Sequence, residues 1–232
     1  MTKMRTSSPC PSGQESLYGG FYLAFQMLFL PSLLFWINDQ LPRAFSETEL
    51  NFVFYLVNFL AVLLIFRKFL GRNLRQLTQH PIDALQAAIL GFVAYYACFH
   101  ALEWLIGLLM PSYTNYNDQS IAALSRGNYS LMFLGTVILV PPVEECLYRG
   151  LIFRNLYNNN KWAAYAISIA AFAGIHILGY IGVYAPAQLL IAILQYLPAG
   201  IWLAWSYLKG NTIFVPIAIH AAVNFITIRG IL

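Results

Sequence analysis

The chemistry that this sequence suggests centres on three charged residues, Glu144, Glu145 and Arg149, in a segment otherwise apolar enough to cross a membrane. A charged side chain at the middle of a bilayer-spanning helix costs roughly 3 kcal/mol, so three within one short segment require a function or strong internal compensation. Glu145 and Arg149 are four residues apart with the acid first, the favourable order for an ion pair on one helix face. We interpret this segment as the start of an active site.

Polar residues in two later apolar segments repeat the same spacing. Phe172 and His176 are four residues apart, and so are His220 and Asn224. Residues at positions i and i+4 share one face of a helix. Because polar groups that faced lipid would be left unpaired, we expect these faces and that of the acidic segment to surround one hydrated cavity.

Two prolines precede the acidic pair. Pro141 and Pro142 lack the backbone N–H that continues a helix, so we expect a kink or a restart in this span. If Pro142 opens a new helical piece, Glu144 falls in its first turn, where free amides and the helix dipole favour a carboxylate.

These patterns together resemble the motifs of the CPBP family of intramembrane proteases, which includes type II CAAX prenyl endopeptidases and bacteriocin-processing or self-immunity proteins. The three motifs occur in order, each in its own predicted span, and the resemblance covers roughly residues 131–224. The matching residues are Glu144, Glu145 and Arg149 for EExxxR, Phe172 and His176 for FxxxH, and His220 and Asn224 for HxxxN.

The resemblance implies hydrolysis of a peptide bond inside the membrane. Glu144 would act as general base on a water molecule that His176 also holds. His220 and Asn224 would donate hydrogen bonds to the oxyanion of the tetrahedral intermediate, and removing one such donor costs on the order of 3 kcal/mol in comparable enzymes.

The neighbours of the base have other expected roles. Glu145 is expected to hold Arg149 and orient the motif, which leaves Glu144 as the base. Cys146 lies beside two carboxylates, which disfavour a thiolate, so we expect it to pack in the core and not to act as a nucleophile. The three cysteines of the chain allow no disulfide framework and no CxxC metal pair.

The same residues could instead hold a metal. Two histidines and a glutamate, here His176, His220 and Glu144, form the ligand set of many hydrolytic zinc sites, with water in the fourth position. The sequence lacks the HExxH pairing that puts two ligands and a base on one helix. We therefore favour a mechanism without a metal or other cofactor and keep zinc as the alternative.

Composition predicts an all-α, polytopic integral membrane protein, because 59% of the residues are hydrophobic and only 9% are charged, against about a quarter charged in soluble domains. The 232 residues divide into a polar tail at 1–16 and a single membrane domain at 17–231, with the catalytic region at 129–231. About seven transmembrane helices are expected, the fourth interrupted by proline. The apolar segments are 17–37, 51–66, 85–109, 129–153, 162–178, 187–208 and 213–231.

The basic residues predict the orientation. With the N-terminus inside, most lysines and arginines fall on the cytoplasmic side, as short positively charged loops do. The net charge of +4 thus reflects topology, and nothing in it indicates nucleic-acid binding. The cytoplasmic set is Lys3, Arg5, Arg67, Lys68, Arg72, Arg75, Arg154, Lys161 and Lys209, against Arg43, Arg126 and Arg229 outside.

One expectation conflicts with this picture. If each span is centred in the bilayer, Glu144 lies slightly cytoplasmic of the middle, whereas His176 lies near the outer end of its own span. Straight helices would then separate the two in depth by ~10 Å. Either the fifth helix begins before Trp162 and sits lower, or helix tilts and the proline kink close this gap.

Other polar residues within the spans have local roles. His100 and Glu103 share a helix face and are expected to pair with each other or to line the substrate path. Asn58, Gln188 and Gln195 are expected to form hydrogen bonds between helices.

The sequence therefore predicts an integral membrane endopeptidase of a prokaryotic cell membrane that cuts a peptide or lipidated protein near the bilayer. Two other classes remain open. One is a proton-coupled transporter, since buried Glu, Arg and His also mark ion paths. The other is an immunity or scaffold protein that keeps the fold and acts through partners. The substrate's identity does not follow from the residues.

Overall fold

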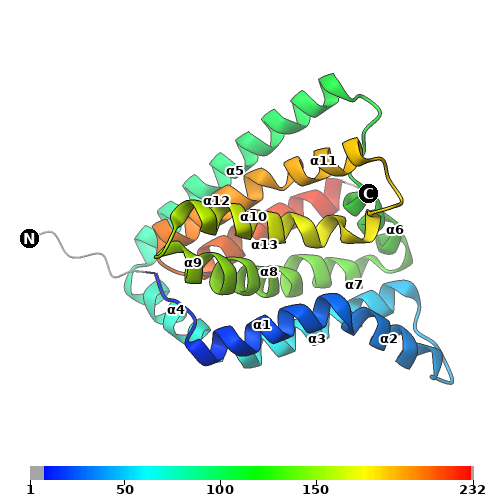
Figure 1. The fold of residues 1–232 in the computed structure, drawn as a ribbon, viewed down its shortest axis with the longest axis horizontal. Coiled ribbons are helices and arrows are strands. Elements are labelled where there is room, and N and C mark those ends of the chain that lie inside the picture. Colours follow the sequence, from blue (N-terminus) through cyan, green and yellow to red (C-terminus); the bar gives the residue numbers. More distant parts are fainter. Residues whose placement is uncertain (1–7, 231–232) are drawn as a thin grey trace, which may run out of the picture.

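The computed structural model describes residues 8–230, and over that part of the chain it consists of helices without strands. The predicted all-α membrane bundle is confirmed. Helices α1 to α3 form one flank and α5 the other, and the helices that carry the three motifs lie between them (Figure 1). The predicted catalytic groups are thus placed at the centre of the bundle.

The first flank begins with capped helices. Ser12 and Ser46 each accept a hydrogen bond from the backbone of the third helical residue, and Glu15 and Glu49 return a bond to the cap backbone. Such reciprocal caps satisfy amides that a helix start leaves free. Helices α1 and α2 meet at a bend of 52°. The bounds are α1 (Gly13–Leu28), α2 (Leu30–Asp39) and α3 (Glu47–Ile65).

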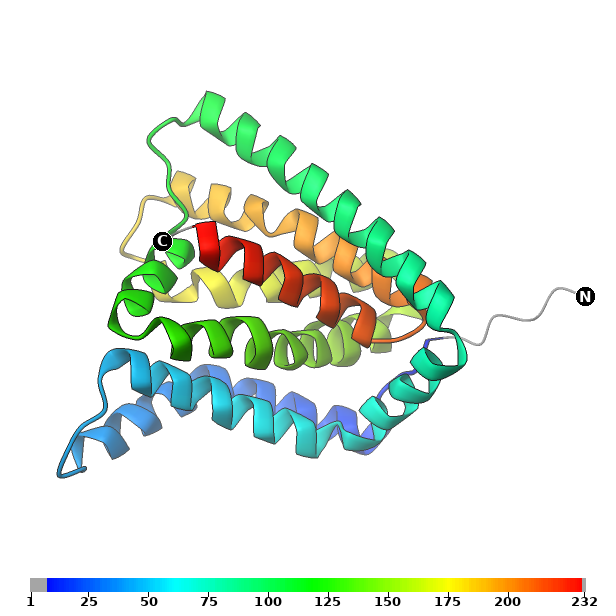
Figure 2. The same ribbon diagram turned by 180° about the vertical axis from the view of Figure 1, so that it is seen from behind.

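The second flank is a single long helix that packs closely near its start. A Cβ atom on Gly91 would lie only 2.9 Å from both Ser206 Cβ and Ile219 Cδ1, so glycine lets α5 approach α12 and α13. Toward its C-terminal end α5 leans away from the bundle (Figure 2). The elements here are α4 (Arg67–Gln79), α5 (Pro81–Leu109) and α6 (Tyr116–Gly127).

The fourth span, Tyr129–Tyr157, stays helical through its two prolines instead of breaking. Its turns widen to π-helix on both sides of them, and the Val140 N–H accordingly reaches the carbonyl of Gly135, five residues back. Wide turns of this kind are rare and occur frequently at functional sites. Glu144 ends a short α-helical piece and does not begin one. The pieces are α7 (Tyr129–Phe133), η1 (Leu134–Leu139), α8 (Val140–Glu144), η2 (Glu145–Arg154) and α9 (Asn155–Tyr157).

The remaining helices return the chain across the bundle three times. Helix α10 packs against η2 and α12, and α13 packs against η1, α5 and α12. Side chains near the middle of α10, α12 and α13 therefore face the fourth span. The bounds are α10 (Lys161–Ile177), η3 (Leu178–Tyr180), α11 (Pro186–Gln195), α12 (Leu197–Gly210) and α13 (Phe214–Gly230).

The number of spans is lower than expected. Five helical stretches of the described chain are long and apolar enough to cross a membrane, and the bent pair α1 and α2 would make a sixth. Helices α11 and α12 together count as one of the five, and α13, with 17 residues, is shorter than a typical span. The predicted count of seven is not confirmed.

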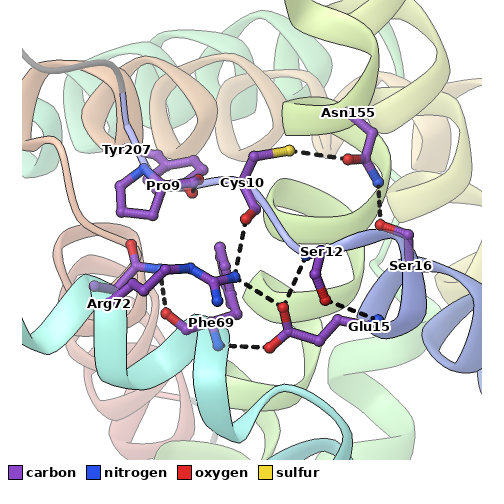
Figure 3. Close-up of polar contacts among 10 residues, drawn as sticks. Pro9, Cys10, Ser12, Glu15, Ser16, Phe69, Arg72, Asn155 and Tyr207 are labelled. Carbon is purple, nitrogen blue, oxygen red and sulfur yellow. Dashed lines mark hydrogen bonds and ion pairs between the residues drawn. The ribbon is translucent and has the colours of Figure 1, made fainter.

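A short N-terminal segment, residues 8–12, closes one end of the bundle (Figure 3). Arg154 donates a 2.9 Å hydrogen bond to the Ser8 carbonyl, and the Tyr207 hydroxyl donates to the carbonyl of Pro9. Arg72 donates to the Cys10 carbonyl at 3.0 Å. The segment thereby joins α4, η2 and α12 at the end where the basic residues gather.

Glu15 links this segment to the start of α4. Its carboxylate accepts from the Ser12 N–H at 2.8 Å and from the Phe69 N–H at 2.6 Å, and it pairs with Arg72 at 2.8 Å (Figure 3). The Phe69 N–H belongs to the first turn of α4 and has no partner within its own helix. Glu15 therefore caps a second helix besides its own.

Replacing Glu15 with alanine is expected to lower the free energy of unfolding by roughly 1–3 kcal/mol, because the buried Phe69 N–H loses its acceptor. Thermal denaturation of the purified chain in detergent measures this. The matched control is Glu47→Ala, which removes an exposed glutamate from the first turn of α3. Equal melting temperatures for the two variants would contradict the capping role.

Polar residues predicted to join helices do so at two of three positions. Asn58 accepts a 2.9 Å bond from Tyr22 of α1, and Gln195 bonds to Glu103, whereas Gln188 bonds to the Ala185 N–H at the start of its own helix. The partner of Glu103 is therefore Gln195 and not His100.

Candidate active site

A cavity of about 440 Å³ lies inside the bundle and contains the predicted catalytic groups. Its wall is formed by residues of α3, α5, α6, η1, α8, α10, α12 and α13. Glu144, His176, His220 and Asn224 line it, whereas Glu145 and Arg149 do not. The two adjacent acids therefore occupy different environments.

Glu144 is the acid that faces the cavity. Its side chain is 17% exposed, and its two carboxylate oxygens lie near two imidazoles. Oε1 lies 3.9 Å from His176 Nε2, and Oε2 lies 3.6 Å from His220 Nε2. Oε2 is buried and has no hydrogen-bond partner among the described residues. The carboxylate therefore lies between two imidazole nitrogens, and its unpartnered oxygen leaves a hydrogen bond for a molecule in the cavity.

The expected difference in depth between Glu144 and His176 does not occur. Glu144 lies thirteen residues before Tyr157, and His176 lies fifteen residues after Lys161, on either side of one tight turn. At 1.5 Å per residue both stand roughly 20 Å above that turn. The ~10 Å separation applies only to spans that are each centred in the bilayer, whereas here the shared turn sets the heights of both.

Glu145 lies in a closed ion-pair network behind the cavity. Its Oε1 atom is 3.0 Å from Arg149 Nη1 and 2.8 Å from His220 Nδ1, and the side chains of Glu145 and Arg149 are both 0% exposed. Arg149 also donates to the Ala199 carbonyl at 3.1 Å, and its guanidinium lies 4.1 Å from the ring centre of Phe172. Hydrogen bonds from several sides are what allow a charged pair to be buried.

The hydrogen bonds fix how each imidazole faces Glu144. His176 Nδ1 lies 2.7 Å from the Phe172 carbonyl, which can only accept, so Nδ1 carries the proton. His220 Nδ1 faces the carboxylate of Glu145, which likewise accepts. Both rings therefore turn Nε2 toward Glu144, and a neighbouring group sets the tautomer of each. The i, i+4 spacing of the FxxxH motif gives His176 this carbonyl partner.

Asn224 lines the same cavity but is not in contact with the acids. Its side-chain amide donates one 2.9 Å hydrogen bond to the carbonyl of Thr136, in the π-helical turn before the prolines. A carboxamide has a second N–H, which this bond leaves available.

Three features of the site were not predicted from the sequence. Tyr196 stacks on His176, with ring centres 4.3 Å apart, and lines the cavity. The Ala199 carbonyl anchors Arg149, and Asp118 contributes a second carboxylate to the wall. Every residue has a backbone carbonyl, so residue type does not indicate which carbonyl will bind Arg149. Asp118 lies in α6, a polar helix that is not part of any predicted membrane span.

The described residues include no group of three His, Cys, Asp or Glu side chains arranged to hold a metal ion. The nearest approach to such a group is Glu144 with His176 and His220, at the separations given above. The zinc alternative therefore stays a prediction.

Cys146 is fully buried in the hydrophobic core and lies outside the cavity wall. This position agrees with a packing role.

Comparison with known protein families confirms the resemblance. Residues 126–226, which span all three motifs, match the family described as type II CAAX prenyl endopeptidase Rce1-like. No curated protein and no solved structure matches the chain. With its apolar helices, the chain is an integral membrane protein.

Proposed function

We propose that this chain, whose residues 126–226 carry the Rce1-like match, is an intramembrane endopeptidase that uses Glu144 to activate water. The observation that carries the proposal is the Glu144 carboxylate, which lies between two imidazoles in a cavity at the centre of the bundle and has one oxygen without a hydrogen-bond partner among the described residues.

In the proposed reaction, Glu144 removes a proton from a water molecule in the cavity as the water oxygen attacks the carbonyl carbon of the scissile amide. His176 supports this step, because its unprotonated Nε2 faces the same carboxylate and can accept the water's other hydrogen bond. The stacked ring of Tyr196 keeps the imidazole in this orientation.

The tetrahedral intermediate carries an oxyanion, for which we assign two donors. The second N–H of Asn224 is one of them, with the amide held in place by the Thr136 carbonyl. His220 is the other: with a proton on Nε2 as well as Nδ1 it is an imidazolium, stabilised by Glu145 on one side and Glu144 on the other. Donors fixed in a site with little water stabilise such a charge strongly.

Collapse of the intermediate breaks the C–N bond and requires a proton on the leaving nitrogen. Glu144 has held the water's proton since the first step and donates it here, which restores its carboxylate. Glu145 and Arg149 act as positioning residues, because they hold His220 and touch no cavity space.

We further propose that the basic end of the bundle lies in the cytoplasm, together with the N-terminus. In the structure α4, the turn between α9 and α10, and the end of α12 gather at that end (Figure 1). Most lysines and arginines predicted for the cytoplasm belong to α4 or to the end of α12, while Arg154 ends η2 just before α9 and Lys161 begins α10. Lys3 and Arg5 lie outside the described residues. Short loops rich in positive charge stay on the cytoplasmic side.

The test of this function is the accumulation of uncut substrate. Membrane proteins from a strain that carries Glu144→Gln are compared by mass spectrometry with those of the wild-type strain and of a Glu47→Gln control strain. We expect one or a few proteins to accumulate intact in the Glu144→Gln strain only, and their wild-type fragments give the cut site.

Two results would favour the other classes of protein. Normal activity in a strain with both Glu144→Ala and His176→Ala would indicate an immunity or scaffold role. Solute flux into vesicles containing the pure chain, without any accumulated precursor, would indicate a transporter.

A further inference from the structure

The described wall of the reaction cavity contains no lysine or arginine to offset its acids. Apart from tyrosines, its ionisable residues are Asp118, Glu144, His176 and His220, and no described lining residue is a lysine or arginine. The Arg149 guanidinium is buried behind Glu145 and is already paired. The imidazolium proposed for His220 offsets one of the two carboxylates, Glu144 and Asp118, so with both acids ionised the cavity keeps a net negative charge.

Asp118 is the acid that the proposed reaction does not use. It lies in the first turn of α6, where its backbone N–H bonds to the Asn115 side chain at 3.2 Å. Its carboxylate has no hydrogen bond or ion pair with another described residue, and burial, together with the nearby charge of Glu103, raises the pKa of Asp118 to about 6. Above that pH the Asp118 carboxylate is charged and lies near Glu103 without a positively charged partner in the described part of the chain.

Asp118 also stands on the route to the catalytic groups. The cavity extends from Glu144 to the α6 end of the bundle, where Gly179, an exposed residue, forms part of its wall. A second cavity adjoins it there, and its wall contains Asp118 together with Glu103 and Gln195. No described residue of α4 or of the turn between α9 and α10 lines either cavity.

The opposite end of the bundle is filled. Phe66, Phe69 and Tyr207 are fully buried there. The N-terminal segment covers that end through its bonds to Arg72 and Tyr207 (Figure 3) and to Arg154. A peptide that reaches Glu144 along the cavity therefore passes Asp118.

We propose that the site selects a peptide segment with a basic side chain, whose cation lies between Asp118 and Glu103 while the scissile bond lies at Glu144. The same charges disfavour a substrate that brings a free C-terminal carboxylate into the cavity, because like charges repel strongly where little water screens them. This inference rests on the proposed peptidase function and concerns its substrate class.

The experiment uses the full chain in phosphatidylcholine vesicles and a set of peptides with both termini blocked. The peptides share one apolar sequence and carry a single lysine, glutamine or glutamate at successive positions, and one further glutamine peptide has a free C-terminal carboxylate. Mass spectrometry gives the rate of cleavage for each. The variants are Asp118→Asn and Glu103→Gln, with Asp39→Asn as the control, since Asp39 is exposed at the same end of the bundle.

We expect the lysine peptide to be cut about tenfold faster than the glutamine peptide at one or two positions, with the glutamate and free-carboxylate peptides slowest. The ratio of lysine to glutamine rates should fall toward one in Asp118→Asn and Glu103→Gln and stay unchanged in Asp39→Asn. Using two variants covers the case in which one fails to fold.

Equal rates for lysine, glutamine and glutamate peptides, or a lysine preference that persists in both variants, would overturn the inference. The peptidase itself is judged separately. Cleavage of the glutamine peptide that disappears in Glu144→Gln supports the proposed function even without a lysine preference, whereas cleavage that persists in Glu144→Gln contradicts it.

Discussion

Replacement of Glu144 with glutamine will reduce the rate of peptide cleavage by about a thousandfold or more, because an amide cannot accept the proton of the attacking water. The fold should be unaffected. Glu144 forms no hydrogen bond with the described residues, and its oxygens lie beyond hydrogen-bond distance of both imidazoles. The measurement is cleavage of a substrate identified by its accumulation, using the purified chain in vesicles, with melting temperature as the check on folding.

A control variant at the neighbouring acid tests whether the role of base belongs to Glu144. Glu145→Gln should also reduce the rate, but it should lower the melting temperature as well, because Glu145 holds Arg149 and His220. Activity that survives in Glu144→Gln while being lost in a folded Glu145→Gln would move the base to the second acid.

A chelation experiment with the same substrate addresses the zinc alternative. We expect the wild-type rate to be unchanged after prolonged treatment with a strong chelator, since Glu144 acts on water directly. Loss of activity that returns on adding zinc would instead make Glu144, His176 and His220 metal ligands.

Substitution of Arg149 with methionine will destabilise the protein by roughly 3–5 kcal/mol, the largest loss of stability that we expect from a single change. Methionine has a similar length but no charge, so the Glu145 carboxylate would stay fully buried with only His220 as a partner. The Ala199 carbonyl would lose its donor and Phe172 its cation. Thermal denaturation in detergent, at one fixed scan rate, measures the change.

Arg154→Met is the matched control for this prediction. Arg154 is also buried, at 3% exposure, and lies in the same π-helical segment, but it bonds to the Ser8 carbonyl and the Asn158 side chain and to no carboxylate. Its loss leaves no buried charge unpaired, so the melting temperature should fall less. The double variant Glu145→Gln, Arg149→Met should be more stable than Arg149→Met alone. A smaller loss in Arg149→Met than in Arg154→Met would contradict this account.

The sequence predicts the catalytic groups better than it predicts what surrounds them. Residues four apart on apolar helices had to share a face, and the cost of exposing charge to lipid had to turn these faces inward, so the approach of His176 and His220 to Glu144 followed from local rules. The relative height of two helices depends on the turn that joins them. For that reason the sequence alone could not decide whether Glu144 and His176 lie at the same depth.

Other features depend on tertiary packing and leave no trace in residue type. The prolines predicted an irregularity in the fourth span, which the structure shows as a widened helix and not as a break. This form depends on neighbours such as Tyr55, whose ring lies where a Cβ on Gly135 would be. The count of seven is not confirmed because the first predicted segment is a bent pair of helices and the last, α13, is shorter than a typical span. Asp118 was missed because it lies in a polar helix between spans.

The cavity reaches the α6 end of the bundle and not the basic end, which has a practical consequence. If the basic end faces the cytoplasm, as proposed, the catalytic groups are reached from the opposite compartment, past α6 and the end of α10. Hydrolysis then consumes water of that compartment and releases its more soluble fragment there. A polar inhibitor added outside the cell would reach Glu144 without crossing the lipid. Resistance to it would therefore arise from substitutions at the rim of the cavity and not from a membrane that excludes the inhibitor.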